Sequence, residues 1–355
     1  MVNVADSERY TALVSKGRML LRGVGEMGAL DVGKICTLKR VSLLVQRLIK
    51  TEGDAFGVRA IADGARVTCN EPGVLLNKII KVHMPNDPRF TALYKFEPYI
   101  EMVIKYVSKY ALSQVLPLPG FDLSVDDATV ITTYLNECVD KIRQEAGSKR
   151  FLSKLNNYQR SSNKNYRELT EYVDMLFECH SRLLVLRVDL SYQKQYSETT
   201  QAQAKRDLKH LFENARSNKL FGEMVGFIWK LEHGSEKGFH YHVMFFFDGS
   251  KVREDITLAK RIGQYWTDVV TRGRGLYFNC NAGKLAYKSC GIGMIGHTDA
   301  ALRKGLRNAV IYLTKTDLFM KLQTEGRGMG KGLFPSPKGP RGRPRAATSV
   351  KERMA

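Results

Sequence analysis

The sequence is poor in the features that build disulfide scaffolds and membrane segments. Its six cysteines are scattered over 355 residues, with no C-x-x-C pair and no paired spacing. This pattern excludes a disulfide framework and a cysteine zinc site, and it predicts the reduced thiols of a cytosolic protein. The longest apolar runs, such as LLVL and VMFFF, are too short to cross a bilayer, so we expect no membrane segment. The polar start, MVNVADSERY, lacks an apolar signal region, so we expect no secretory signal.

Acidic residues are scarce relative to basic ones. The chain has 56 Lys and Arg against 36 Asp and Glu, which gives a formal net charge of +20 and a pI of about 9.7. Such an excess favours a polyanionic partner, through counterion release and long-range attraction. Because the chain has no basic amphipathic terminus, we favour nucleic acid over a membrane surface. Hydrophobic residues at 43% and the chain length are sufficient for two folded domains.

The two halves of the chain differ in their hydrophobic pattern. Apolar residues recur at helical spacing in the first half, which predicts helices over residues 37–53, 97–116, 128–147 and 167–183. From about residue 183 the pattern favours strands over 183–192, 226–232, 238–247 and 275–281. Between and after these strands it favours helices over 197–219, 253–273 and 301–322.

The order of these elements predicts an α+β fold. Strand–helix–strand–strand–helix–strand–helix is the order of a ferredoxin-like layer, in which helices flank an antiparallel sheet. We therefore divide the chain into a helical region over 1–178, a candidate for DNA binding, and a sheet domain over 179–325.

Residues 326–355 are rich in Gly, Pro, Arg and Lys and predict a disordered basic tail. Within it, GPRGRPR resembles the core of an AT-hook, with Arg341 and Arg343 directed along an A·T-rich minor groove; a generic basic tail is the alternative.

The stretch GFHYHVMFFF places two histidines in an otherwise apolar strand. Alternate side chains of a strand share a face, so His240 and His242 point the same way. They are either satisfied polar groups at the end of a core strand or two ligands of one metal ion. Glu232 ends the preceding strand, and a hairpin through HGSEKG would bring it beside His240. Two imidazoles and a carboxylate suit Mn²⁺ or Mg²⁺ with open positions, and His233 is a substitute ligand.

An open metal site in a basic protein suggests phosphodiester chemistry, which needs a nucleophile. Tyr312 has Lys315 one turn later on the same helix face, and a nearby cation would help to ionise a phenol whose pKa is ordinarily about 10. The same Y-x-x-K spacing occurs at Tyr106 and Lys109, so the spacing alone does not choose between the two tyrosines. The order of the motifs favours Tyr312, which follows the histidines.

A hydrophobic strand, a Glu before a hairpin, His-hydrophobic-His and a later Tyr-x-x-Lys form the pattern of HUH endonucleases. More closely, VLRVDLSY, GFHYHVMFFFDG, IGQYW and AVIYLTKTD resemble the filamentous-phage (inovirus-type) replication initiators, a family that also covers the YagK/YfjJ C-terminal domain. The resemblance spans about residues 180–322. Two departures are Tyr241 in place of an aliphatic residue between the histidines and Thr316 where a second tyrosine would stand.

The resemblance implies a rolling-circle replication initiator that nicks single-stranded or hairpin origin DNA in the cytoplasm of a bacterial host. Glu232, His240 and His242 would bind the metal ion, Tyr312 would form a 5′-phosphotyrosine and Lys315 would assist it. No Walker A motif is present, so a host helicase would unwind the DNA. We also assign DNA contacts to Arg187, Arg341 and Arg343. Two other functions remain open: a non-catalytic DNA-binding regulator and a hydrolytic metal-dependent nuclease.

Overall fold

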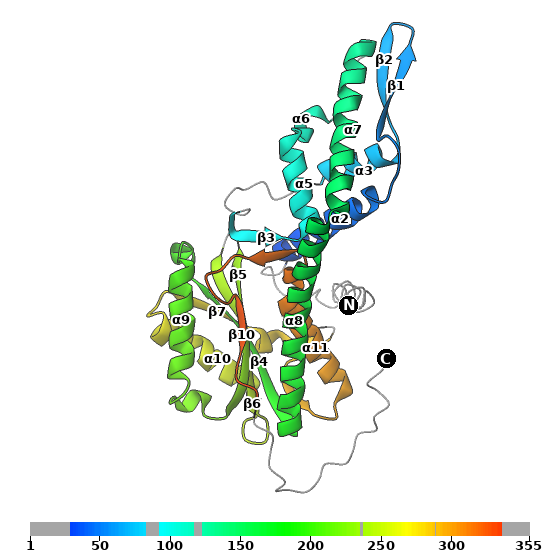
Figure 1. Cartoon of the computed structure of the whole chain (residues 1–355). Helices are drawn as coiled ribbons and strands as arrows, with labels where there is room; N and C mark the ends of the chain where they lie inside the picture. Colours follow the sequence, from blue (N-terminus) through cyan, green and yellow to red (C-terminus); the bar gives the residue numbers. More distant parts are fainter. Residues whose placement is uncertain (1–28, 83–91, 117–122, 235–236, 288, 336–355) are drawn as a thin grey trace.

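The computed structural model describes residues 29–82, 92–116, 123–234, 237–287 and 289–335. It is a mixture of helices and an antiparallel sheet, which confirms the α+β class. An upper, mainly helical part stands on a lower part that contains the sheet, and one long helix, α8, runs alongside the sheet (Figure 1). No helix in the described part of the chain is long and apolar enough to cross a membrane.

The upper part consists of helices around one apolar core and a β-hairpin. Its helices are α2 (Ala29–Leu48), α3 (Glu71–Ile80), α5 (Pro98–Lys109), α6 (Leu112–Val115) and α7 (Val125–Gly147). Its strands β1 (Phe56–Ile61) and β2 (Gly64–Cys69) pair with each other and pack on α7, and β3 (Tyr94–Phe96) lies at its lower edge. This hairpin was not predicted from the sequence; its two-residue turn is Ala62-Asp63, and Gly64 begins β2 with a positive φ of 150°.

Ser148 separates α7 from α8 (Lys149–Cys179). Its backbone is extended, and its hydroxyl accepts a hydrogen bond from the Phe151 amide, which caps the N-terminus of α8. The lower half of α8 belongs to the core beneath the sheet, because Leu169, Tyr172 and Leu176 pack there against Val185 and other strand residues. The core that α8 shares with the sheet thus includes residues that precede the boundary expected at residue 178.

The central sheet has six antiparallel strands in the order β10-β5-β6-β4-β7, with β8 also paired to β4. These strands are β4 (Arg182–Tyr192), β5 (Met224–Gly234), β6 (Gly238–Asp248), β7 (Gly275–Asn279), β8 (Gly293–Gly296) and β10 (Met329–Lys331). Helices α9 (Gln201–Asn214) and α10 (Asp255–Tyr265) cover one face, and α8 and α11 (Ala300–Thr314) cover the other. The sheet is thus covered by helices on both faces.

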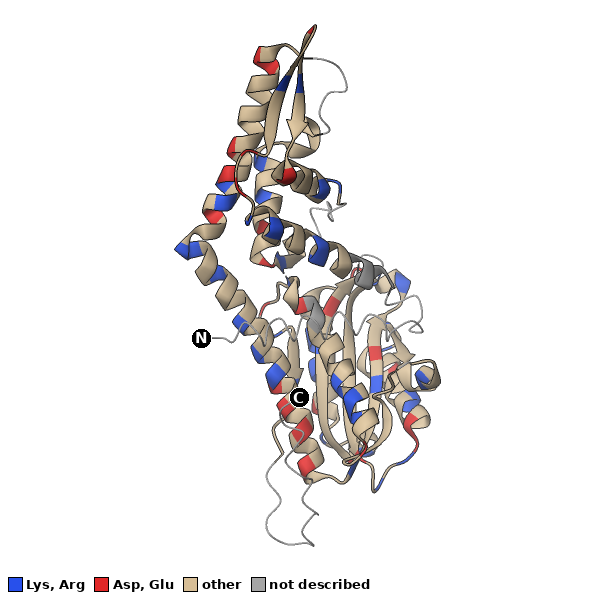
Figure 2. Cartoon of the chain, turned by 90° about the vertical axis from the view of Figure 1, so that its right-hand side faces the viewer, with Lys and Arg blue, Asp and Glu red and all other residues tan. Residues whose placement is uncertain are grey.

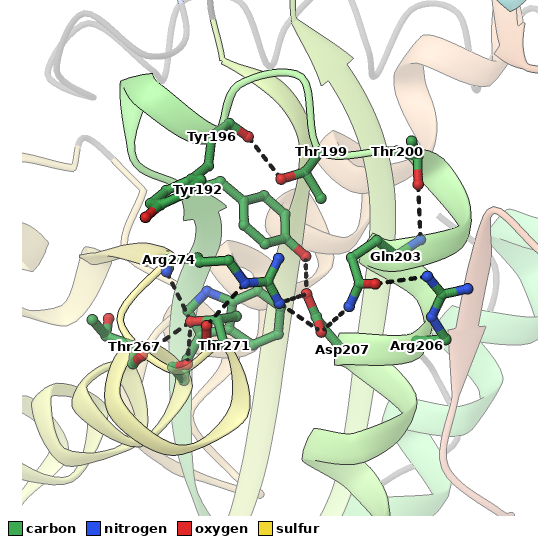
Figure 3. Close-up of polar contacts among 12 residues, drawn as sticks. Tyr192, Tyr196, Thr199, Thr200, Gln203, Arg206, Asp207, Thr267, Thr271 and Arg274 are labelled. Carbon is green, nitrogen blue, oxygen red and sulfur yellow. Dashed lines mark hydrogen bonds and ion pairs between the residues drawn. The ribbon is translucent and has the colours of Figure 1, made fainter.

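A buried polar network fastens α9 to the edge of the sheet (Figure 3). The carboxylate of Asp207 accepts hydrogen bonds from the hydroxyl of Tyr192 at 2.8 Å and the amide of Gln203 at 2.8 Å, and it pairs with Arg274 at 3.2 Å. These hydrogen bonds and the ion pair compensate for the cost of burying the Asp207 carboxylate beneath α9.

Two segments near the C-terminus differ from the expectation. The helix predicted over 301–322 ends at Thr314, is followed by the short helix η6 (Lys315–Leu318), and gives way to β9 (Met320–Leu322), which pairs with β3 of the upper part. The first residues of the tail predicted over 326–355 are ordered, since Met329–Lys331 forms the edge strand β10 on β5, and residues 336–355 lie outside the described residues. Both strands are too short to be read from a local pattern, and the backbone hydrogen bonds of a distant strand order them.

Candidate metal and nucleophile site

The face of the sheet that α8 and α11 cover changes character along its length. Its lower end is apolar and includes Val185, Ile228 and Met244. At the upper end the same face carries Glu232 on β5 and the two histidines on β6. The register pairs Glu232 directly with His240, as expected from the hairpin. Tyr241 points to the opposite face and packs in the other core, at 5.9 Å between its ring centroid and that of Trp229.

Glu232, His240 and His242 form a cluster suited to a metal ion. One ligand atom from each side chain lies within 4.8 Å of the other two. The Nε2 atom of His242 is 3.3 Å from a carboxylate oxygen of Glu232, and the two imidazole centroids are 5.2 Å apart. Both histidines are buried, with exposed fractions of 4% and 6%. The three residues are therefore preorganised by the strand backbone instead of by a flexible loop.

The second nitrogen of each imidazole is held by the protein. Nδ1 of His240 lies 3.1 Å from the carbonyl oxygen of Gly238, and Nδ1 of His242 lies 2.8 Å from Oδ1 of Asp189 on β4. Donation of the Nδ1 proton to these acceptors leaves the lone pair of each ring on Nε2. A carboxylate or carbonyl behind a histidine is the usual support of a metal ligand, so this donor set fits a divalent cation.

Two carboxylates and an imidazole at this site stabilise one another in their charged forms. Burial opposes the charged imidazole, yet Asp189 and Glu232 outweigh it and raise the pKa of His242 to about 9. Burial also opposes ionisation of Glu232, but the hydrogen bond and charge of His242, with smaller effects of His240 and Lys230, lower the pKa of Glu232 to about 2. The site thus stabilises positive charge between two carboxylates, which is the electrostatic requirement for a cation.

Tyr312 of α11 reaches the same end of the sheet. Its ring centroid is 6.4 Å from that of His242, and the guanidinium carbon of Arg187 lies 5.1 Å from the centre of the tyrosine ring. Arg187 is itself buried and pairs with Asp189 at 3.2 Å. The structure thereby brings Tyr312 close to the cluster of Glu232, His240 and His242, whose nearest member is 70 residues earlier in the sequence.

A buried ion pair lies beside this cluster. Lys230, directly opposite His242 on β5, pairs with Asp317 in η6, just after the helix of Tyr312. Both side chains are buried, and Asp317 also receives a hydrogen bond at 3.4 Å from the amide of Asn165 on α8. The pair therefore connects β5, the turn after α11 and the long helix α8.

We expect Lys230→Met to lower the free energy of unfolding by about 3–5 kcal/mol, because the substitution leaves the Asp317 carboxylate buried without its ammonium partner. Chemical denaturation measures this change. The double variant Lys230→Met/Asp317→Leu should lose much less, since no buried charge is left uncompensated. Lys251→Met is the matched control: it breaks an exposed lysine–glutamate pair at 2.8 Å and should leave stability nearly unchanged. Equal losses in the two single variants would contradict the structural role of the buried pair.

The other residues singled out in the sequence have different positions. Tyr106 lies in the upper core, where burial and Glu145 raise its pKa to about 12. His233 points away from the cluster and packs against Phe239 at 4.8 Å between ring centroids. Arg187, for which a DNA contact was expected, is buried beside the ring of Tyr312. The side chain of Lys315 and the whole of Arg341 and Arg343 lie outside the described residues.

Sequence reasoning missed the supporting roles of Asp189, Lys230 and Asp317. A signal existed for the first two, because each places a charged side chain on the histidine face of a mostly apolar strand. Asp317 gave no such signal, since its importance comes from the turn that ends α11.

Comparison with known families supports part of the resemblance. Residues 121–287 match the model of a family described as the YagK/YfjJ C-terminal domain. The match starts just before α7 and ends one residue after the short helix η5 (Cys280–Ala286), so it contains Glu232, His240 and His242 but stops before α11 and Tyr312. It thus extends further toward the N-terminus than the expected span of about 180–322 and ends earlier. No curated protein and no solved structure matches the chain.

Proposed function

We propose that this protein is an HUH endonuclease of the replication-initiator type, which nicks and rejoins one DNA strand through a tyrosine. The observation that carries the proposal is the approach of Tyr312 to Glu232, His240 and His242 on one sheet face. The net charge of +20 supports a DNA substrate, and the ferredoxin-like order of strands and helices supports the fold assignment.

The donor set favours a particular kind of metal ion. Two of the three ligands are imidazole nitrogens, whereas Mg²⁺ prefers oxygen ligands and water. We therefore infer Mn²⁺ as the preferred ion of the two expected from the sequence. When bound, such an ion would supply Lewis-acid polarisation of a phosphate oxygen.

The chain's own residues perform the covalent step. The phenol oxygen of Tyr312 loses its proton to solvent and forms a bond to phosphorus, while the bond from phosphorus to the 3′ oxygen breaks. The 3′ oxygen takes a proton and leaves as a hydroxyl, and a 5′-phosphotyrosine remains. Arg187, near the tyrosine ring, stabilises negative charge on the phenolate and the phosphate. The phosphoester bond is conserved, so attack by a 3′-hydroxyl on the phosphotyrosine rejoins the strand without a nucleotide cofactor.

A labelled-oligonucleotide assay tests the proposal. Single-stranded and hairpin oligonucleotides with a randomised central segment are incubated with the protein and Mn²⁺, then separated under denaturing conditions. A label 3′ of the nick should migrate with the protein, and a label 5′ of it should appear on a shorter strand that a polymerase can extend. Cleavage without a protein adduct would favour the hydrolytic nuclease. Binding without cleavage would favour the non-catalytic regulator.

A truncation that tests the role of the basic tail should retain β10, because this strand pairs with β5 of the sheet. We expect truncation after residue 335, which retains β10, to lower affinity for A·T-rich duplex DNA and to flatten its salt dependence, because Arg341 and Arg343 are lost. Nicking of single strands should be unaffected. Fluorescence anisotropy over a range of salt concentrations measures both effects, with Arg341→Gln/Arg343→Gln as the smaller change. An unaltered salt slope in the truncated protein would rule out the AT-hook interpretation.

A further inference from the structure

The charges of α8 are segregated along its length. Between Lys149 and Arg167 the helix has six basic residues and no acidic ones, whereas between Glu168 and Glu178 it has four acidic residues and no basic ones. Figure 2 shows Lys and Arg on the upper part of this helix and Asp and Glu at its lower end. If these charges served only to keep the helix soluble, we would expect basic and acidic residues to be mixed along it.

The two halves of the helix also differ in how their charges are used. Two of the four acidic residues form ion pairs within the protein: Asp174 pairs with Arg303 at 2.7 Å and with Arg307 at 3.3 Å, and Glu168 pairs with Lys331 at 3.5 Å. The basic half is exposed. In the part of the chain that the structure describes, Lys149, Arg150, Arg160 and Lys164 have no carboxylate partner within 4.0 Å.

The exposed basic residues lie on one side of the helix. At 3.6 residues per turn they share that side with serine and asparagine, and together they form what we call the basic stripe: Lys149, Arg150, Ser153, Lys154, Asn157, Arg160, Ser161, Lys164 and Arg167. The opposite side buries Phe151, Leu155 and Tyr158. The stripe extends over about 27 Å at 1.5 Å per residue. Like charges four residues apart, such as Arg160 and Lys164, destabilise a helix, so the stripe does not contribute to the local stability of α8.

The inner side of the same helix contacts η6, the turn that follows the helix of Tyr312. The hydroxyl of Ser162 donates to the carbonyl oxygen of Asp317 at 2.7 Å, and the amide of Asn165 contacts the carboxylate of Asp317 at 3.4 Å. Asp317 follows Tyr312 by five residues. The turn that follows the helix of Tyr312 is therefore packed against the middle of α8.

We propose that the basic stripe binds the phosphate backbone of double-stranded DNA next to the nick, such as the stem of a hairpin. This inference rests on the proposed function for the position of the nick. Lys, Arg, Ser and Asn are among the side chains that commonly contact the phosphates of DNA. The stripe has no aromatic residue on which unpaired bases could stack, which favours a duplex over a single strand.

The test compares two variants with equal loss of charge. The stripe variant replaces Lys149, Arg150, Arg160 and Lys164 with Gln, and the control replaces Arg216, Lys219, Lys260 and Arg261, which are exposed beyond the other face of the sheet. The affinity of the full chain for a duplex of unrelated sequence is measured between about 50 and 200 mM salt. For the stripe variant we expect the slope of log K against log salt to become shallower by about 3 to 4, because each lost phosphate contact removes about 0.9. The control should change the slope by less than about 1.

Two further measurements separate this inference from the proposed function. Nicking of a short single strand should be the same in the stripe variant and the parent. If the parent does not nick DNA at all, the proposed function fails, yet the comparison of salt slopes still decides whether the stripe binds duplex DNA. Equal slopes in the two variants, or a stripe variant that loses binding to phosphatidylserine vesicles while its DNA slope is unchanged, would overturn the proposal.

Discussion

Tyr312→Phe is expected to abolish both DNA nicking and the covalent protein–DNA complex, while binding of Mn²⁺ and DNA persists. The substitution removes a single oxygen, the one that would attack phosphorus, and retains the ring that packs near His242 and Arg187. Gel separation of labelled DNA measures nicking and adduct together. Peptide mapping of the parent adduct should place the phosphotyrosine on residue 312, and its discovery on any other residue would refute the assignment.

Tyr106→Phe is the matched control, because Tyr106 also has a lysine three residues later. Its hydroxyl lies 2.9 Å from a carboxylate oxygen of Glu145, and its raised pKa holds it protonated and thus a weak nucleophile. This variant should nick DNA at the rate of the parent. A loss of nicking in both variants would point to general damage to the fold instead of the loss of a nucleophile.

Replacement of both metal-site histidines, His240→Ala/His242→Ala, should reduce Mn²⁺-dependent cleavage by about 10³-fold or more, since Lewis-acid assistance contributes several kcal/mol to such reactions. Glu232→Ala should reduce cleavage less, because two imidazoles remain and water can take the place of the carboxylate. Calorimetric titration with Mn²⁺ after chelator treatment measures binding directly. Mn²⁺ should also raise the melting temperature of the parent and leave that of the double variant unchanged.

His210→Ala is the control for the histidine variants. His210 lies on α9, which covers the opposite face of the sheet, and it belongs to no cluster of metal-ligating residues in the described structure. Its variant should bind Mn²⁺ and cleave DNA as the parent does. If the double-histidine protein kept full activity in the presence of Mn²⁺, the metal-site assignment would fail.

The amino-acid sequence by itself determined the elements that depend on local spacing. The alternation of a strand puts His240 and His242 on one face whatever surrounds them, and the short hairpin fixes their register with Glu232. The order of strands and helices likewise limits the sheet to a few arrangements, because consecutive elements usually pack as neighbours. These parts of the prediction needed no information on distant contacts.

Tertiary structure alone decided which distant residues complete the site. The pairing of Lys230 with Asp317, the approach of Arg187 to Tyr312 and the end of α11 at Thr314 depend on how α8 and α11 pack on the sheet. The strands β9 and β10 have only three residues each and exist because a remote strand supplies their hydrogen bonds. Local propensity carries no signal for such contacts, since their free energy is gained only when segments far apart in sequence come together.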